Sequence, residues 1–276
     1  MTRFFIPMAL RVEPFQGLCP AGDLVAEVVC RPGALDHGER LAQTADNPFS
    51  LLHIEHAEVD LESGTLPFSE AACRKARTTL DAYVAQEILV PEAVPCVYLY
   101  RLKAGEREQT GIAITCALDD LPTDDPQGDA GEVAGRARLI TALNAQTSPV
   151  VLTYPESADL DALSAEVVKI PPLYDFTTPD GVAHTLWRVP GEALGAFFIR
   201  AFADVPGATI VEGAAQAAAM AQVRRERREA DPSHTGKEPW NRALALFFPR
   251  NRWNAFCANG TAPALQPLSG LFIHRL

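Results

Sequence analysis

The residues of this chain that could do chemistry are centred on Glu212 and Gly213. A β-branched run precedes them and an alanine-rich segment follows them as far as Glu229, a pattern that predicts a strand, a tight turn and a helix. The first backbone N–H groups of a helix have no partner within the helix, so they favour an anion such as phosphate at this turn. Glu212 could hold a ligand hydroxyl or a magnesium ion, or it could cap the helix and interact with its dipole.

The turn itself carries no reactive side chain, because Ala214 and Ala215 follow Gly213. A glycine between a strand and a helix often marks a positive φ angle or a close backbone approach. The sequence contains no Gly-rich phosphate loop of the Walker or dinucleotide type and no Gly-x-Ser-x-Gly nucleophile motif. We therefore predict a place for a ligand and assign no catalytic residue.

The histidines are weaker candidates. His53 lies in an apolar run at 49–54 that is typical of a strand, where a lone histidine is more often a hydrogen-bonded core residue than a catalyst. His53 and His56 would point to opposite faces of such a strand, so we predict no metal site. His184 precedes an apolar Leu-Trp pair, and we interpret it as a packing residue.

Composition excludes several classes of protein. The chain has 276 residues, 47% of them hydrophobic, and can bury a sizeable core. Its net charge of −11 argues against a nucleic-acid binder, and the basic run at 224–228 is interpreted as the solvated C-terminal end of a helix. No apolar run is long enough to span a membrane, and the six cysteines form no Cys-x-x-Cys pair. We predict a cytoplasmic protein with reduced thiols.

Hydrophobic periodicity and turn residues predict an α+β fold, with a mixed α/β sheet and flanking helices. We expect a hairpin from 96–102 and 110–118, followed by a loop at 119–131 whose aspartates face solvent. The chain is expected to form a single domain over 1–276, or to divide into an α+β part at 1–125 and an α/β part at 126–276. The other predicted elements are helices at 36–45, 69–89, 132–144, 159–169 and 192–203, and strands at 49–54, 150–154, 184–189, 208–211, 244–248 and 270–273.

Several segments, taken in order, resemble the uncharacterised bacterial family called domain of unknown function 1015. Together they span most of the chain, and their order makes the set more specific than any one segment. They are ALRVEP (9–14), NPFSLLHI (47–54) with Glu58 and Asp60, the YLYR run ending at Arg101, QTGIA (109–113), ALNAQTSPVVLTY (142–154), DGVAHTLWRV (180–189) and IVEG (210–213).

The chain departs from the family's pattern at the predicted turn. Where the family typically carries Asp-Gly-His-His-Arg, this chain has EGAAQ at 212–216, so both imidazoles and the guanidinium are missing. Upstream, the family's His-Glu and Lys-Glu-x-Asp-Arg pattern is replaced by DP at 125–126 and EVAGR at 132–136, of which only Arg136 remains. The chain also stops at FIHRL, where the family's sequences continue. It is expected to be a shortened, divergent member.

The resemblance also implies a fold and an activity. The family's Gly-His-His-Arg loop is similar to the phosphate-contacting loop of the ParB and sulfiredoxin-like fold, which implies such a core around residues 180–250. A relative with the full loop would then bind a nucleotide, with magnesium, as a small-molecule kinase or a nucleotide hydrolase. Catalysis of phosphoryl transfer depends on positioning and charge stabilisation, so the loss of these side chains favours an inactive site.

Two hypotheses for the function remain. In the preferred one, the protein is a non-catalytic or weakly ligand-binding member of the family that keeps a degenerate phosphate- or nucleotide-binding turn. In the alternative, it is a nucleotide-dependent enzyme with a rebuilt active site. An oligomer or a partner chain could supply the missing C-terminal part. The candidate ligand-binding residues are Glu212, Gly213, Gln216, His53, Glu58 and Arg136.

Overall fold

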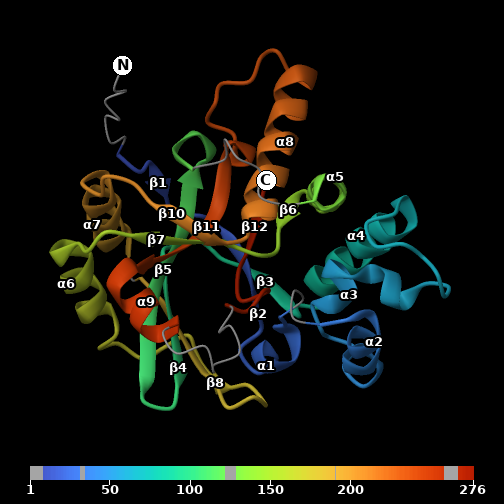
Figure 1. Ribbon diagram of the computed structural model, residues 1–276, viewed down its shortest axis with the longest axis horizontal. Coiled ribbons are helices and arrows are strands. Elements are labelled where there is room, and N and C mark those ends of the chain that lie inside the picture. The colour runs from blue at the N-terminus through green and yellow to red at the C-terminus, as the bar shows by residue number, and fades with distance from the viewer. Residues whose placement is uncertain (1–8, 32–34, 122–128, 190, 258–266) are drawn as a thin grey trace.

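The computed structural model describes residues 9–31, 35–121, 129–189, 191–257 and 267–276 of the protein. Its larger sheet has eight strands in the order β10-β7-β11-β5-β4-β9-β8, with β1 paired to β5 (Figure 1). All pairs are antiparallel except β7 with β11, which are parallel. These strands are β1 (Val12–Glu13), β4 (Tyr98–Ala104), β5 (Arg107–Ala117), β7 (Val150–Tyr154), β8 (Tyr174–Thr177), β9 (Ala183–Arg188), β10 (Thr209–Glu212) and β11 (Arg242–Pro249).

A smaller sheet has the strand order β3-β2-β12-β6. Its strands are β2 (Gly17–Pro20), β3 (Leu89–Pro91), β6 (Ala145–Gln146) and β12 (Ile273–Arg275). The helices are α1 (Val25–Val28), α2 (His37–Ala45), α3 (Leu52–Glu55), α4 (Glu70–Ala85), α5 (Ala130–Leu143), α6 (Ala158–Val167), α7 (Gly191–Ala203), α8 (Ala214–Ala230) and α9 (Arg250–Cys257). Short 3-10 helices are η2 (Ala57–Asp60), η3 (Leu118–Asp120) and η4 (Pro239–Asn241).

Helices α5, α6, α7 and α8 cover one face of the larger sheet. Their buried side chains form one apolar cluster with the face of β5 that carries Ile112 and Ile114, and the aromatic rings of Phe198 and Phe202 in it are fully buried. The alternation of side chains along β5 explains this arrangement, because every second residue points to the same face. The buried residues of the opposite face, among them Tyr98 and Tyr100, pack against α1 and the chain before β12.

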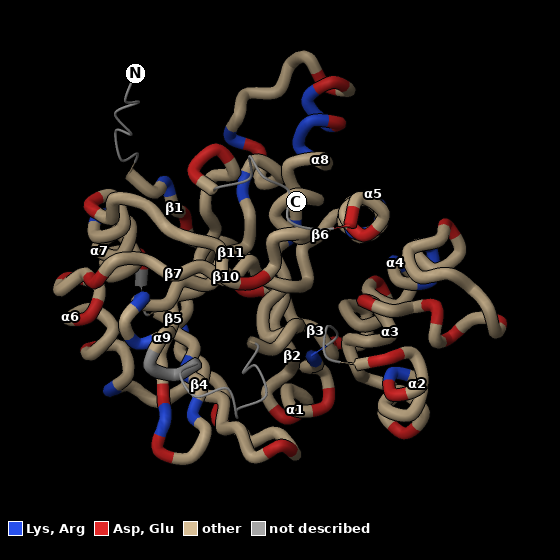
Figure 2. Tube along the Cα trace, in the orientation of Figure 1, with Lys and Arg blue, Asp and Glu red and all other residues tan. Residues whose placement is uncertain are grey.

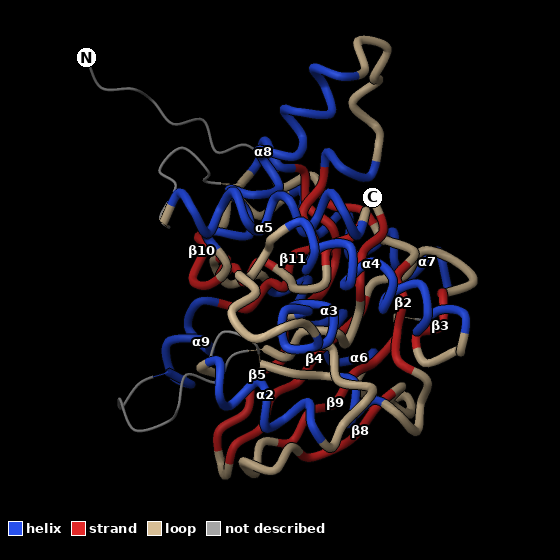
Figure 3. The backbone as a smooth tube through the Cα atoms, turned by 90° about the vertical axis from the view of Figure 1, so that its right-hand side faces the viewer, coloured by secondary structure: helices blue, strands red, loops and turns tan. Residues whose placement is uncertain are grey.

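Helix α8 lies beside α5 and continues past the edge of the larger sheet, as two views of the molecule show (Figures 1 and 3). The segment after α8 returns to β11, which places the first turn of α8 near the sheet and its far end outside it. Basic residues are concentrated at that far end (Figure 2). The two ends of α8 therefore lie in different surroundings.

The expected α+β class, with a mixed sheet and flanking helices, is confirmed. The predicted hairpin is present as β4 and β5, and Ser69 begins α4 by accepting a hydrogen bond from the backbone N–H of Ala72 (3.3 Å). The sheet takes strands from both sides of residue 125, and the subdivision there stays a prediction. A ParB- or sulfiredoxin-like core at 180–250 also stays a prediction.

The strand predicted at 49–54 is wrong, because this segment turns into the short helix α3. The hydroxyl of Ser50 accepts a hydrogen bond from the backbone N–H of Leu52 (3.3 Å), which favours a helical start. Leu51, Leu52 and Ile54 are all fully buried. A short apolar run that is buried on every side has no alternating pattern, so the sequence could not distinguish the two structures.

Candidate functional site

The expected strand, turn and helix are present as β10, Gly213 and α8. Gly213 has φ +82° and ψ 25°, in the left-handed region, as the sequence suggested. A Cβ atom at this position would lie 3.3 Å from the Cα of Val150 and 3.4 Å from the carbonyl oxygen of Pro149. Glycine is therefore required here both by the backbone conformation and by the close approach of the chain before β7.

A cavity of about 260 Å³ opens at this turn. Its wall includes the residues from Glu212 to Gln216, which form the end of β10 and the first turn of α8. The neighbouring helix α5 contributes Glu132 and Arg136. Arg31, Ser148 and Ser269 complete the polar part of the wall. Segments that are far apart in the sequence thus meet at the start of α8.

Gln216 is one of the two most enclosed polar residues of this wall, with 6% of its surface exposed against 5% for Ser269. Its side chain makes no hydrogen bond within the part of the chain that the structure describes. The first hydrogen bond within α8 runs from the backbone N–H of Ala217 to the carbonyl of Gly213 (2.9 Å), so the N–H groups of the three residues before Ala217 have no helical acceptor. The Gln216 side chain and a set of backbone donors therefore face the cavity without a partner in the described chain.

Arginines lie on two sides of the cavity. Arg136 is half-buried, and its Nε donates to Glu132 Oε1 one turn earlier on α5 (2.9 Å). Arg31 forms an ion pair with Asp180, and its Nη2 lies 3.3 Å from His184 Nε2. A guanidinium has five donors, so Arg136, which donates to one carboxylate, can still donate to a ligand. The cavity therefore combines backbone donors with two cations.

His184, on β9 of the larger sheet, contacts Arg31 through its Nε2 atom. It is fully buried, as expected for a packing residue, and its ring stacks on Tyr100 and Phe176. Burial, together with the nearby Arg31, lowers the pKa of His184 to about 3, so the ring is neutral. Because a guanidinium only donates, Nε2 accepts and the proton lies on Nδ1, 2.7 Å from the Tyr100 hydroxyl.

Glu212 lines the same cavity and makes no hydrogen bond or ion pair with the described part of the chain. Burial raises the pKa of its carboxyl to about 7. Helix α8 begins at Gly213 without a side-chain cap, so Glu212 does not cap it by a hydrogen bond. A contact with a ligand and an interaction with the helix dipole both stay predictions for Glu212.

Two of the six candidate residues lie away from this cavity. His53 is held through Nδ1 by Asp60 Oδ1 (2.8 Å) and through Nε2 by the carbonyl oxygen of Asn47 (3.0 Å). Glu58 is buried, and its carboxylate contacts His56 Nδ1 at 3.0 Å. The structure thus brings together Glu212, Gly213, Gln216 and Arg136 and leaves His53 and Glu58 outside.

The sequence did not indicate a buried polar group behind the cavity wall. Glu55 is 5% exposed and accepts hydrogen bonds from the hydroxyls of Thr147 and Ser148, the latter at 2.7 Å. Ser148 also contacts the hydroxyl of Ser269 (2.8 Å). The pair of hydroxyl residues just before the strand at 150–154 was the available signal. The sequence did not predict their partner Glu55, because this residue lies at the end of α3, where a strand was expected.

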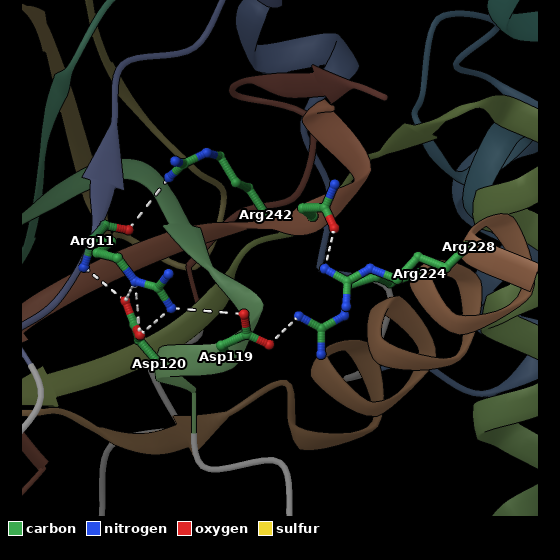
Figure 4. A network of polar contacts seen from close by, with 7 residues as sticks. Arg11, Asp119, Asp120, Arg224, Arg228 and Arg242 are labelled. Atoms are coloured by element: carbon green, nitrogen blue, oxygen red, sulfur yellow. Dashed lines mark hydrogen bonds and ion pairs between the residues drawn. The ribbon is translucent and has the colours of Figure 1, made fainter. Parts of the chain in front are cut away.

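The basic run further along α8 was interpreted as a solvated helix end, and this is wrong for Arg224 and Arg228 (Figure 4). Arg224 Nη1 donates to Asp119 (2.5 Å), and Arg228 Nη2 donates to Asn241 (2.8 Å). The carboxylate of Asp120 is buried by Arg11 (2.7 Å), so it does not face solvent as predicted. Both corrections come from tertiary packing: η3 and η4 lie against α8, and Asp120 of η3 meets Arg11 just before β1. The expectation for residues 122–128 lies outside the described residues.

Within the described residues, no group of three or more His, Cys, Asp or Glu side chains is placed to hold a metal ion. None of the helices described has the length and apolarity that crossing a membrane requires. Cys19, Cys30, Cys73, Cys96 and Cys116 are buried free thiols.

Comparison with known proteins gives a family and no closer relative. The chain has no significant match among curated proteins or among solved structures. One family model, described as a protein of unknown function (DUF1015), matches residues 12–254 and so includes the Gly213 turn, Arg136 and Arg31. Because the match extends over most of the 276 residues, the chain belongs to the DUF1015 family, whose function is unknown.

Proposed function

We propose that this protein binds a small phosphorylated ligand in the cavity at Gly213, without acting on it. The observation that carries the proposal is Gln216, whose side chain lines the cavity without a partner in the described chain, beside the unpaired N–H groups of the first turn of α8. Polar groups that face a cavity without a protein partner can bind a ligand directly. The start of a helix favours a phosphate or another anion as that ligand.

The arginines of the wall support an anionic ligand. Arg136 is paired with Glu132 and Arg31 with Asp180, so the cavity is not strongly positive before a ligand enters. The remaining donors of Arg136, together with the first backbone N–H groups of α8, suit the oxygens of a phosphate group. A weak or moderate affinity is expected from this balance of charges.

The size of the cavity limits the ligand. Pockets for drug-sized molecules usually measure about 300–1,000 Å³. At about 260 Å³ the cavity suits a phosphate or diphosphate group with a small organic part. A nucleotide would fit only if its base and sugar lay outside the described wall.

A nucleotide-dependent enzyme is the second candidate, and Glu212 is the observation that favours it. A general base works best when its pKa lies near the working pH, and burial raises the pKa of Glu212 to about 7. Against this, His53 lies away from the cavity, and the family's imidazoles are alanines here. Release of phosphate from ATP in the presence of magnesium, lost in Glu212→Gln, would favour the enzyme.

The test of binding is a calorimetric titration with inorganic phosphate, pyrophosphate and ATP, each with and without magnesium. Arg136→Gln is the decisive variant, and Arg138→Gln is its matched control. Both arginines are on α5, but Arg138 lies outside this cavity and donates to the carbonyl of Phe68. Loss of a charged hydrogen bond should weaken binding about 10- to 100-fold in Arg136→Gln, with no change in Arg138→Gln. No saturable heat with any of the three anions would end the proposal.

We keep the cytoplasm as the proposed compartment. The buried thiols that the structure describes are unpaired, which suits a reducing environment. A thiol titration of the denatured protein, isolated under non-reducing conditions, should find them free.

A further inference from the structure

We propose that Glu212 takes up a proton when the anion enters the cavity, so that ligand binding strengthens as the pH falls. This inference rests on the proposed function, since it needs an anion at the Gly213 turn. It adds a regulation of the same site by pH.

The geometry places the carboxyl next to the bound anion. Glu212 immediately precedes Gly213, and both line a cavity of about 260 Å³. An anion held by the first N–H groups of α8 in so small a space lies close to the Glu212 carboxyl. Two negative charges at short range in a half-buried site repel strongly, and a proton on the carboxyl removes the repulsion.

The charged neighbours do not remove this repulsion for Glu212. Helix α5 contributes Arg136 and Glu132, which form an ion pair with each other, and Arg31 is paired with Asp180. The adjacent strand β7 presents Val151 opposite Glu212. Arg250 of α9 contacts the other end of β10, at the hydroxyl of Thr209 (3.4 Å). Glu212 therefore meets the incoming anion without a cation of its own.

The direction of the pH effect follows from the free protein. Burial raises the pKa of Glu212 to about 7, so the carboxyl is largely neutral at pH 6 and largely ionised at pH 8. In the complex, Glu212 carries the proton at both pH values. Binding at pH 8 must therefore include protonation of Glu212, which costs free energy, whereas at pH 6 most of the free protein already carries the proton. Affinity should then fall by up to about tenfold between pH 6 and pH 8.

Sulfate is the probe for the experiment, because it is a tetrahedral dianion that does not itself titrate in this range. Calorimetry at pH 8 in two buffers of different ionisation enthalpy counts the protons taken up per bound sulfate. We expect close to one proton for the natural protein. In Glu212→Gln the count should fall to zero, and the affinity at pH 8 should rise to the value that the natural protein shows at pH 6. Glu229→Gln is the control, since Glu229 lies at the other end of α8, outside this cavity, and the variant should keep the proton uptake.

The outcomes separate this inference from the proposed function. Sulfate binding without proton uptake overturns the inference and leaves the binding site standing. Proton uptake that persists in Glu212→Gln also overturns it, because another group then carries the proton. If sulfate, phosphate and pyrophosphate all fail to bind at pH 6, the proposed function falls, and the inference falls with it. The proton count of the natural protein needs no variant, so a poorly folded variant cannot hide the answer.

Discussion

Helix α8 borders two groups of polar side chains, the cavity at its first turn and the network of ion pairs further along it (Figure 4). In the network, Arg224 and Arg228 donate to Asp119 and Asn241, and Arg11 donates to Asp120. At the cavity, the first N–H groups of α8 and the side chains of Glu212 and Gln216 have no such partners in the described chain. The charged groups of the network are paired within the protein, although the Nε of Arg228 is buried without a partner in the described chain. The charge of a region alone therefore does not mark a candidate binding site, whereas polar groups that face a cavity without a protein partner do.

The largest expected effect concerns the shape of the cavity turn. Gly213→Ala places a side chain at φ +82° and 3.3 Å from the Cα of Val150, so it should lower the free energy of unfolding by about 2–3 kcal/mol. Gly236→Ala is the matched control, since Gly236 has φ +81° and open space around it. It should cost only the conformational strain, about 1 kcal/mol. Equal losses in urea denaturation would show that the close approach at Gly213 is unimportant.

The next effect tests the network. Asp120→Asn removes the charge of a buried carboxylate that accepts from Arg11 Nη2 and from its backbone N–H (2.8 Å). Because Arg11 is itself half-exposed, we expect a loss of about 1–2 kcal/mol in the free energy of unfolding. Asp119→Asn removes a more exposed carboxylate and should cost less. If Asp119→Asn proved the costlier change, Arg224 would be the main anchor of the network.

A smaller effect should depend on pH. Folding raises the pKa of Glu212 from its ordinary value near 4.5 to about 7, so the folded state holds this proton more tightly than the unfolded state does. The carboxyl then has no effect on stability below about pH 4 and lowers it as the pH rises through 7. Glu212→Gln should match the natural protein at pH 4 and exceed its stability by about 1–2 kcal/mol at pH 8. Thermal unfolding across this range checks the sign, and a constant difference would contradict it.

The smallest effect separates the two kinds of arginine on α8. Arg224→Ala loses the ion pair with Asp119 and should cost less than about 1 kcal/mol, because Asp119 is half-exposed. Arg225→Ala should change stability within the error of the measurement, since its side chain is exposed. Neither substitution should alter anion binding. A change in sulfate affinity would mean that the network and the cavity are coupled through α8.

The parts of the fold that the sequence predicted are those with a strong local signal. The hairpin of β4 and β5 has alternating residues and a turn, and α4 has the N-cap Ser69 and apolar residues at helical spacing. The run at 49–54 lacked any period and was assigned to the wrong structure. The strands of the smaller sheet, such as β6 with two residues, are too short to give a pattern.

Of the candidate site, too, the sequence predicted only the part that has a local signal. The sequence by itself determined the Gly213 turn, because a β-branched run, a glycine and an alanine-rich segment dictate strand, turn and helix through local backbone preferences. Only the tertiary structure decided that Arg136 and Arg31 reach this turn and that His53 does not. Contacts between distant segments depend on how the helices pack on the sheet, and no local preference carries that information. Tertiary packing also decided that Gln216 is buried without a partner, and this makes the turn a candidate site.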